Sequence, residues 1–244
     1  MRCMIVIPAR MASTRFPAKP LCDLLGKPMI QWVYERAVAS GVGDRVVVAT
    51  PDSEILERCA EFGAEGVITR GDHPSGTDRL AEVALSFEAD VYVNVQGDEP
   101  LIEPASIAAC ARPLLEPAAD KVDLASVYSP CSDEELDNRA VVKVVTDLEG
   151  FALYFSRHAI PYPRNDRPIP VKKHVGIYAY RRPTLLDFAK WEPTPLERAE
   201  SLEQLRFLEH GRRMILSEGK GSELAVDTPE QAEEVRAILA KRFG

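Results

Sequence analysis

Paired cysteines are missing from this sequence. Its 244 residues include five cysteines, an odd number, and no two of them share a CxxC spacing. Disulfide frameworks and cysteine-ligated zinc sites depend on such pairs, so we expect neither. A chain of this length can bury roughly 70–75% of its unfolded surface and needs no cross-link to hold a core. The sequence therefore predicts a reduced, cytoplasmic protein.

Long hydrophobic runs are missing as well. The apolar run at the N-terminus is interrupted by Pro8 and Arg10, and about seven residues are too few for a secretion signal or a membrane span. We expect a buried strand there instead. The formal net charge of −8 argues against nucleic acid or an anionic membrane as the main partner. We therefore expect small molecules to be the partners.

Acidic residues are absent from the first 22 positions. That segment carries Arg2, Arg10, Arg15 and Lys19, and the first acid is Asp23. Because the chain as a whole is acidic, this local excess of positive charge predicts a binding site for a small anion.

Strand-like and helix-like segments alternate over the first half of the chain. Residues 3–9, 45–50, 66–69 and 90–96 are short runs rich in Val and Ile, and residues 28–40, 52–63 and 77–87 are amphipathic stretches between them. Such alternation is typical of right-handed crossovers and a mostly parallel sheet with helices on both faces. The predicted fold class is α/β.

The second half has more strands and fewer helices. Residues 122–129, 140–147, 151–156 and 174–181 are strand-like, and the segment 160–174 between the last two holds four prolines in ten residues, which predicts a loop. We therefore expect a single domain over residues 1–244, with a strand-rich extension over about residues 130–182.

Helices are also predicted near the C-terminus and after residue 103. In residues 195–211 a stripe of Leu196, Ala199, Leu202, Leu205 and Leu208 predicts one helix with a buried face, ending at Gly211. In residues 227–244, Thr228, Pro229 and Gln231 form a capping-box pattern, and Pro104 suits the first turn of another helix.

The loop after the first strand is the first candidate site. In open α/β sheets, ligands bind beyond the carboxyl ends of the strands. The sequence there, IPARMASTRFPAKPL over residues 7–21, combines small side chains with Arg10, Arg15 and Lys19. Each charge–charge contact at ~4 Å is worth on the order of 4 kcal/mol before desolvation at an effective dielectric near 20, enough to position a triphosphate. The loop has no glycine, so it is not a Walker loop; the alternative is a solvated basic loop.

Asp98 is a candidate magnesium ligand. Asp98 follows a buried strand in VYVNVQGDEP, at the same predicted sheet edge as the cationic loop, where a carboxylate can hold Mg²⁺ beside nucleotide phosphates. A turn residue beside Gly97 is the alternative. Asp227 stands just before the last helix, where a carboxylate compensates the helix dipole.

Other polar residues have both functional and structural explanations. In RGDHPSGTDRL, Asp72 and Ser75 precede a helix and are positioned to recognise a base or ribose, although Ser75 or Thr77 would serve equally as a helix cap. The structural explanation of His174 is that its ring makes a hydrogen bond within the fold. Glu203 and Gln204 are explained as solvated residues, with Glu203 pairing with Arg206, and Arg157 as a surface charge.

Eight segments together resemble one enzyme family in order and over nearly the whole chain. They are IPARMASTRFPAKPL, GKPMI, HPSGTDRL, VNVQGDEP, LYFSR, HVGIYAYR, LEQLR and VDTPE. The chain resembles the 3-deoxy-manno-octulosonate (KDO) cytidylyltransferases, or CMP-KDO synthetases. The resemblance implies the nucleotide-diphosphosugar transferase fold with a small dimerisation lobe, a homodimer, and a Mg²⁺-dependent reaction of CTP with KDO for lipopolysaccharide biosynthesis. In that reaction the anomeric hydroxyl of KDO attacks the α-phosphate of CTP directly.

The resemblance also implies roles for individual residues. The triphosphate clamp would be Arg10, Arg15 and Lys19, with Asp98 and Asp227 as magnesium ligands; Pro8, Ala9, Asp72, Ser75 and Gln96 would surround the cytidine; and Arg157, His174, Tyr178, Glu203 and Gln204 would form the sugar-acid pocket.

Some positions depart from the family pattern, and some alternatives stay open. Met11 stands where an aromatic residue is frequent, Ala18 where glycine is frequent, and Leu224 and Ala225 replace glycines before Asp227. Ala18 is compatible with a tight loop if its φ angle is negative. The alternatives are activation of another ulosonic acid (8-amino-KDO or sialic acid), a sugar-1-phosphate nucleotidyltransferase, and a non-catalytic nucleotide-binding module. The residues do not identify a general base.

Overall fold

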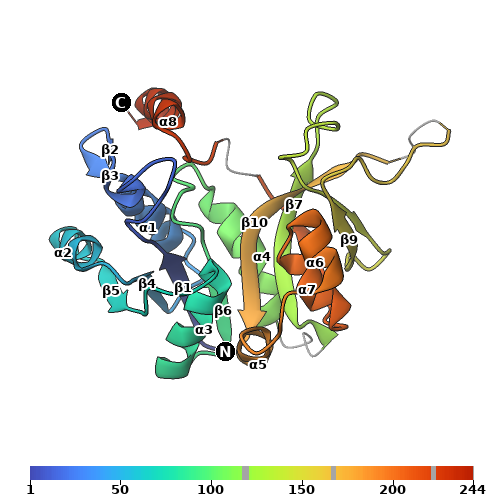
Figure 1. The fold of residues 1–244 in the computed structure, drawn as a ribbon, viewed down its shortest axis with the longest axis horizontal. Coiled ribbons are helices and arrows are strands. Elements are labelled where there is room, and N and C mark those ends of the chain that lie inside the picture. Colours follow the sequence, from blue (N-terminus) through green and yellow to red (C-terminus); the bar gives the residue numbers. More distant parts are fainter. Residues whose placement is uncertain (117–120, 166–168, 221–223, 244) are drawn as a thin grey trace.

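A nine-stranded mixed sheet is the centre of this computed structural model, which describes residues 1–116, 121–165, 169–220 and 224–243 (Figure 1). The main sheet contains β1 (Cys3–Pro8), β4 (Arg45–Thr50), β5 (Glu65–Ile68), β6 (Val91–Asn94), β7 (Leu124–Pro130), β8 (Lys143–Thr146), β9 (Ala152–Ser156), β10 (Lys172–Arg181) and β11 (Met214–Glu218). A separate ribbon joins β2 (Asp23–Leu24) to β3 (Lys27–Pro28). The helices are α1 (Met29–Ala39), α2 (Ser53–Glu61), α3 (Gly76–Ser86), α4 (Pro104–Leu115), α5 (Arg182–Phe188), α6 (Pro195–Glu200), α7 (Gln204–Glu209) and α8 (Pro229–Phe243), with a 3₁₀ turn, η1, at Lys19–Leu21. Among the described residues no helix is long and apolar enough to cross a bilayer.

The first half forms the parallel part of the sheet, as predicted. The strand order is β11-β7-β10-β6-β1-β4-β5, with β1 parallel to both β4 and β6, and β4 parallel to β5. The carboxyl ends of these strands therefore meet at one edge of the sheet. β10 runs antiparallel between β6 and β7, so the sheet is mixed beyond β6.

Alternate residues of the central strand enter two separate cores. Ile5 and Ile7 pack with residues of α1, α2 and α4, whereas Met4 and Val6 pack with residues of α3, α5 and α7. Because both faces are covered, β1 is apolar at nearly every position, which confirms the predicted buried strand. A third cluster joins α8 to α1 and the β2–β3 ribbon (Figure 1).

The predicted helix over residues 195–211 is wrong as a single element. Ser201 has φ 53°, in the left-handed region, and it separates α6 from α7. Leu202 and Leu205 are buried as the stripe predicted, but Leu196 is 40% exposed, because the break turns α6 away from the face that α7 packs against the sheet. The predicted pair between Glu203 and Arg206 is also wrong: Arg206 binds Glu197 instead, with Nε 2.7 Å from Oε2.

Helix-start signals in the sequence are confirmed. α4 begins at Pro104. The Thr228 Oγ1 atom accepts from the Gln231 N–H at 3.4 Å, and Gln231 Oε1 accepts from the Thr228 N–H at 3.1 Å, which is the predicted capping box of α8. Neither α5, which follows β10 directly, nor β11, which adds a parallel strand beside β7, was predicted.

The expected strand-rich extension contains β8 and β9. β8 pairs antiparallel with β9 and with the start of β10, and this part projects at one side of the molecule (Figure 1). In the predicted proline-rich loop, the described residues 160–165 and 169–171 form no helix or strand, and residues 166–168 lie outside the described residues.

Candidate active site

The cationic loop after β1 is closed by backbone hydrogen bonds. The Met11 N–H donates to Asp52 Oδ2 at 2.7 Å, and the Ala18 N–H donates to the Met11 carbonyl at 3.0 Å. Ala18 has φ 56°, so the condition of a negative φ is not met, and the loop is built with Ala18 in the left-handed region. A left-handed conformation costs a residue with a Cβ atom about 1–2 kcal/mol; here it starts the 3₁₀ turn that begins at Lys19.

The Lys19 ammonium lies between the two predicted metal ligands. Its Nζ atom is 2.9 Å from Asp98 Oδ2 and 3.0 Å from Asp227 Oδ1, and Arg15 Nη2 is 2.9 Å from Asp227 Oδ2. Burial lowers the pKa of Lys19, but the two carboxylates outweigh burial and hold that pKa above its ordinary value. Burial likewise raises the pKa of Asp227, and Lys19 with Arg15 brings it below the ordinary value.

Backbone contacts bring the two acids together across the chain. The Val226 N–H donates to the Asp98 carbonyl at 2.8 Å, and the Val226 side chain is fully buried in the core beside α8. Asp227 is the next residue, and its own N–H donates to Gln231 Oε1 at 2.7 Å. The start of α8 is thereby fixed against the loop after β6. Leu224 and Ala225 therefore leave Asp227 able to reach the cationic loop.

A cavity of about 420 Å³ lies at this edge of the sheet. Its lining includes most of the predicted nucleotide residues, namely Pro8, Ala9, Arg10, Arg15, Lys19, Ser75, Gln96, Asp98 and Asp227. Asp72 is exposed and is not among the lining residues. Gly97 lets two loops meet here, because a Cβ atom at that position would stand 2.6 Å from the Pro8 carbonyl.

Two titratable residues of the cavity wall had no prediction. His73 is buried with its ring bonded to Glu82, and Arg79 is buried with Nη1 donating to the Arg70 carbonyl at 2.9 Å. The available signal was their place in HPSGTDRL, on either side of the start of α3. Ser75 is the N-cap of that helix, accepting from the Asp78 N–H at 3.2 Å, so the capping role is confirmed for a residue that also lines the cavity.

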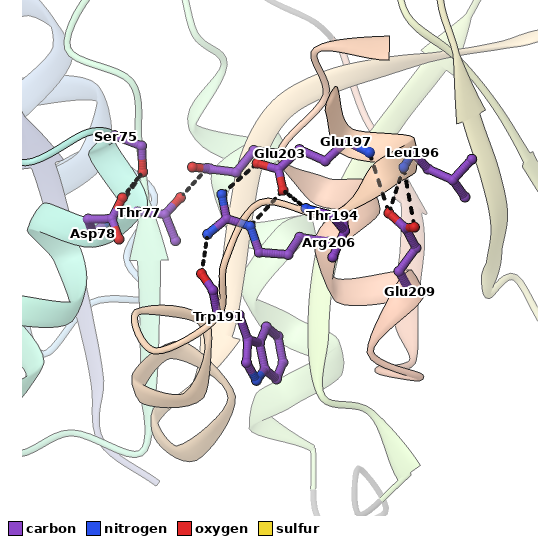
Figure 2. A network of polar contacts seen from close by, with 10 residues as sticks. All are labelled: Ser75, Thr77, Asp78, Trp191, Thr194, Leu196, Glu197, Glu203, Arg206 and Glu209. Atoms are coloured by element: carbon purple, nitrogen blue, oxygen red, sulfur yellow. Dashed lines mark hydrogen bonds and ion pairs between the residues drawn. The ribbon is translucent and has the colours of Figure 1, made fainter. Parts of the chain in front are cut away.

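Four of the five predicted sugar-pocket residues form a second cluster. Tyr178 donates to Gln204 Oε1 at 3.2 Å, and the His174 ring lies 5.3 Å from the Tyr178 ring. Glu203 stands next to Gln204 and accepts a hydrogen bond from Thr77 at the start of α3 (Figure 2). The second cluster is thus joined to the wall of the nucleotide cavity.

Arg157 is placed apart from that cluster. Its guanidinium donates to the carbonyl oxygens of Glu200 at 2.7 Å, Arg139 at 3.0 Å and Ser201 at 3.1 Å. These bonds hold the end of α6 and the Ser201 turn against β9. A role in binding the sugar acid stays a prediction.

His174 is held as a neutral ring. Its Nε2 atom is 2.8 Å from Ser126 Oγ, and the ring lies 5.0 Å from the Phe155 ring. Burial lowers the pKa of His174 to about 3. This geometry favours the structural explanation of His174 over a role as a proton-transfer group.

The neutral state of His174 predicts a pH dependence of stability. Between pH 6.5 and about 3 the unfolded chain protonates this residue and the folded chain does not, so stability is present above pH 6.5 and is lost as the pH falls. From pH 7 to pH 5, the wild type should lose about 1–2 kcal/mol more unfolding free energy than His174→Gln, which retains a polar partner for Ser126. Urea unfolding at both pH values measures this difference; equal losses in the two proteins would contradict it.

Comparisons with known proteins agree with this geometry. A family model described as cytidylyltransferase matches residues 4–215. A 3-deoxy-manno-octulosonate cytidylyltransferase of Pseudomonas fluorescens is 50% identical, covering 96% of this chain and 97% of that protein, and one of Geobacter sulfurreducens is 50% identical, covering 94% and 96%. A solved CMP:2-keto-3-deoxy-manno-octonic acid synthetase in complex with CTP has a TM-score of 0.95 and 44% identity, with full coverage of both chains. The chain therefore belongs to the cytidylyltransferase family and, within it, to the 3-deoxy-manno-octulosonate cytidylyltransferases.

Proposed function

We propose that this chain transfers the cytidylyl group of CTP to KDO, giving CMP-KDO and pyrophosphate for lipopolysaccharide biosynthesis in the cytoplasm. The observation that carries the proposal is the convergence of a cationic loop and two remote carboxylates on one cavity, beside a second cluster of polar side chains. The family relationship supplies the identity of both substrates. A non-catalytic nucleotide-binding module would have no use for the second acid.

The reaction is a single in-line displacement. The anomeric hydroxyl oxygen of the sugar forms a bond to the α-phosphorus of CTP, the bond from that phosphorus to the oxygen bridging the α- and β-phosphates breaks, and the hydroxyl proton is released. Negative charge grows on the phosphate and leaving oxygens, so Arg10, Arg15 and Lys19 act by electrostatic stabilisation and by positioning. No covalent intermediate with the protein is required.

Asp98 and Asp227 would hold the Mg²⁺ ion. Their carboxylates already share one cation, the Lys19 ammonium, and hard oxygen donors are the ligands that magnesium prefers. In the part of the chain that the structure describes, no group of three or more His, Cys, Asp or Glu side chains could hold a metal ion. Phosphate oxygens of the nucleotide would complete the donor set. When bound, the ion neutralises charge that develops on the phosphates.

Side chains of the second cluster match a polyhydroxylated acid. Glu203 presents oxygen acceptors to sugar hydroxyls. Because the Tyr178 hydroxyl donates to Gln204 Oε1, the groups left for the sugar are the amide N–H donors of Gln204 and the acceptor oxygen of Tyr178. Asp72 and Gln96 are proposed for the cytidine, and Arg157 and His174 are proposed as the other two members of the sugar-acid pocket.

Pyrophosphate release from CTP with a panel of sugar acids tests this function. KDO, 8-amino-KDO and sialic acid are supplied in turn, with and without Mg²⁺. We expect release with KDO that depends on Mg²⁺. If pyrophosphate release is faster with 8-amino-KDO or sialic acid than with KDO, that acid is the preferred substrate in place of KDO. Release with none of the three acids would contradict the proposal.

The strand-rich extension is the proposed dimer interface. Within the described residues β9 pairs only with β8, and large apolar side chains are exposed nearby: Leu153 is 61% exposed and Tyr162 85%. An exposed strand edge with apolar side chains is suited to pairing with a second copy.

Replacing one of these apolar residues should therefore separate the two copies. We expect the wild type to be a dimer by light scattering after size exclusion, and Leu153→Asp to be mostly monomeric because a buried unpaired charge is unfavourable. The matched control is Leu85→Asp on α3, where the leucine is 71% exposed. A monomeric wild type, or a dimer that survives Leu153→Asp, would contradict this interface.

A further inference from the structure

Thr77 joins the nucleotide cavity to the second cluster. It is the second residue of α3, its side chain is 2% exposed, and its hydroxyl donates to Glu203 Oε2 at 2.6 Å. Ser75, two residues earlier, caps the same helix and lines the nucleotide cavity. The hydrogen bond joins residues 126 positions apart in the sequence, and it connects the helix beside the nucleotide cavity to the second cluster (Figure 2).

Glu203 needs this partner because its surroundings disfavour a charge. Burial raises the pKa of the Glu203 carboxyl above its ordinary value, and hydrogen bonds from Ser75 and Thr77 act in the opposite direction. The nearest cation gives limited help, since Arg206 is bound through Nε to Glu197 at 2.7 Å and through Nη1 to the Trp191 carbonyl at 3.2 Å (Figure 2). Both side-chain hydrogen bonds to Glu203 therefore come from the start of α3, beside the nucleotide cavity.

On the side of Glu203 away from α3, hydrogen-bonded residues of α6 and α7 form a fixed support. Glu197 belongs to the capping box of α6 with Thr194, and its ion pair with Arg206 connects α6 to α7. The Arg206 guanidinium also lies 4.1 Å from the Phe188 ring centroid. Glu203 begins the turn into α7 from this support, so the direction of its carboxylate is left to the contacts with Thr77 and Ser75.

We propose that Thr77 is a positioning residue, whose hydroxyl holds the Glu203 carboxylate in the direction that lets it accept a hydrogen bond from a hydroxyl of the sugar acid. The inference rests on the proposed function, because it takes Glu203 as a sugar ligand. The two oxygens of a carboxylate offer about four acceptor sites, so the bonds from Thr77 and Ser75 leave acceptor sites for the substrate. The same hydrogen bond fixes the position of the second cluster relative to the nucleotide cavity. An in-line displacement requires such fixed positions of the two substrates.

The test compares Thr77→Val with Thr77→Ser. Valine keeps the shape and removes the donor, whereas serine keeps the donor. We expect Thr77→Val to raise the KM for KDO roughly ten- to hundredfold, the range of a hydrogen bond to a charged group, and to leave the Kd for CTP, measured by calorimetry without sugar, within about twofold. Thr77→Ser should recover most of the KM. Thr184→Val, at another threonine that is 3% exposed, controls for the loss of a buried hydroxyl.

A second comparison asks whether Thr77 acts through Glu203. Glu203→Gln should itself raise the KM for KDO, and adding Thr77→Val to it should change little further. Should Thr77→Val not fold, the pair Thr77→Ser and Thr77→Ala differs only in the hydroxyl and replaces it in every measurement.

The outcomes separate this inference from the proposed function. An unchanged KM for KDO in Thr77→Val, with a raised KM in Glu203→Gln, overturns the positioning role and leaves the sugar role of Glu203 intact. Additive effects in the double variant also overturn it. An unchanged KM in Glu203→Gln removes the sugar role of Glu203 and the inference with it.

Discussion

Asp98→Asn and Asp227→Asn are each expected to lower turnover at least about a hundredfold while the fold stays intact. Losses of this size follow the removal of a group that stabilises charge in a transition state. Each carboxylate also holds the Lys19 ammonium, at 2.9 Å and 3.0 Å, so each substitution disturbs both the proposed metal site and the proposed clamp. Because Asp98 and Asp227 are partly exposed, neither substitution leaves a fully buried group unpaired.

Pyrophosphate release at saturating CTP, KDO and Mg²⁺ measures the turnover, and thermal unfolding followed by circular dichroism checks the fold. Asp137→Asn is the matched control, since Asp137 is exposed and the change in charge is the same. Wild-type rates in both site variants would remove the metal assignment.

Lys19→Ala is expected to weaken the binding of CTP more than that of CMP. The Lys19 side chain is 14% exposed at the cavity wall, and it follows the loop that carries Arg10 and Arg15. We place the outer phosphates of CTP, which CMP lacks, at this ammonium. Loss of a hydrogen bond to a charged group predicts a Kd for CTP roughly ten- to hundredfold higher, with a smaller change for CMP.

Calorimetry with both nucleotides checks this difference. Lys27→Ala is the matched control, because Lys27 pairs with Glu35 outside the cavity, at 2.7 Å. Equal losses for CTP and CMP would contradict the prediction and place Lys19 at the α-phosphate that both share, and no loss for either would place it away from the nucleotide.

The parallel part of the fold was predictable because its strands are buried on both faces. In β1, Ile5 and Ile7 serve one core and Met4 and Val6 serve the other, so the strand is a continuous apolar run that a sequence pattern reveals. The edge strand β11 has no such signal in its five residues, and its place depends on β7 as a neighbour.

The predicted helix over residues 195–211 shows where a periodic pattern fails. The three-residue spacing of leucines continues through Ser201, but the left-handed backbone there ends α6. A periodic pattern shows which side chains are apolar, but it does not show that the φ angle of one residue is positive. The same break gives Glu203 its position, which the pattern assigned to solvent.

The sequence by itself determined that cations follow the first strand and that Asp98 follows β6, because the ends of parallel strands meet at one sheet edge whatever the rest of the chain does. Family resemblance added Asp227 and the two substrates. Only the tertiary structure decided three contacts. Lys19 lies between the two acids, the Val226 N–H bond to the Asp98 carbonyl holds Asp227 close to Asp98, and Thr77 donates a hydrogen bond to Glu203. These contacts join residues 79 to 208 positions apart, and local propensity cannot encode them because they depend on how the whole chain packs.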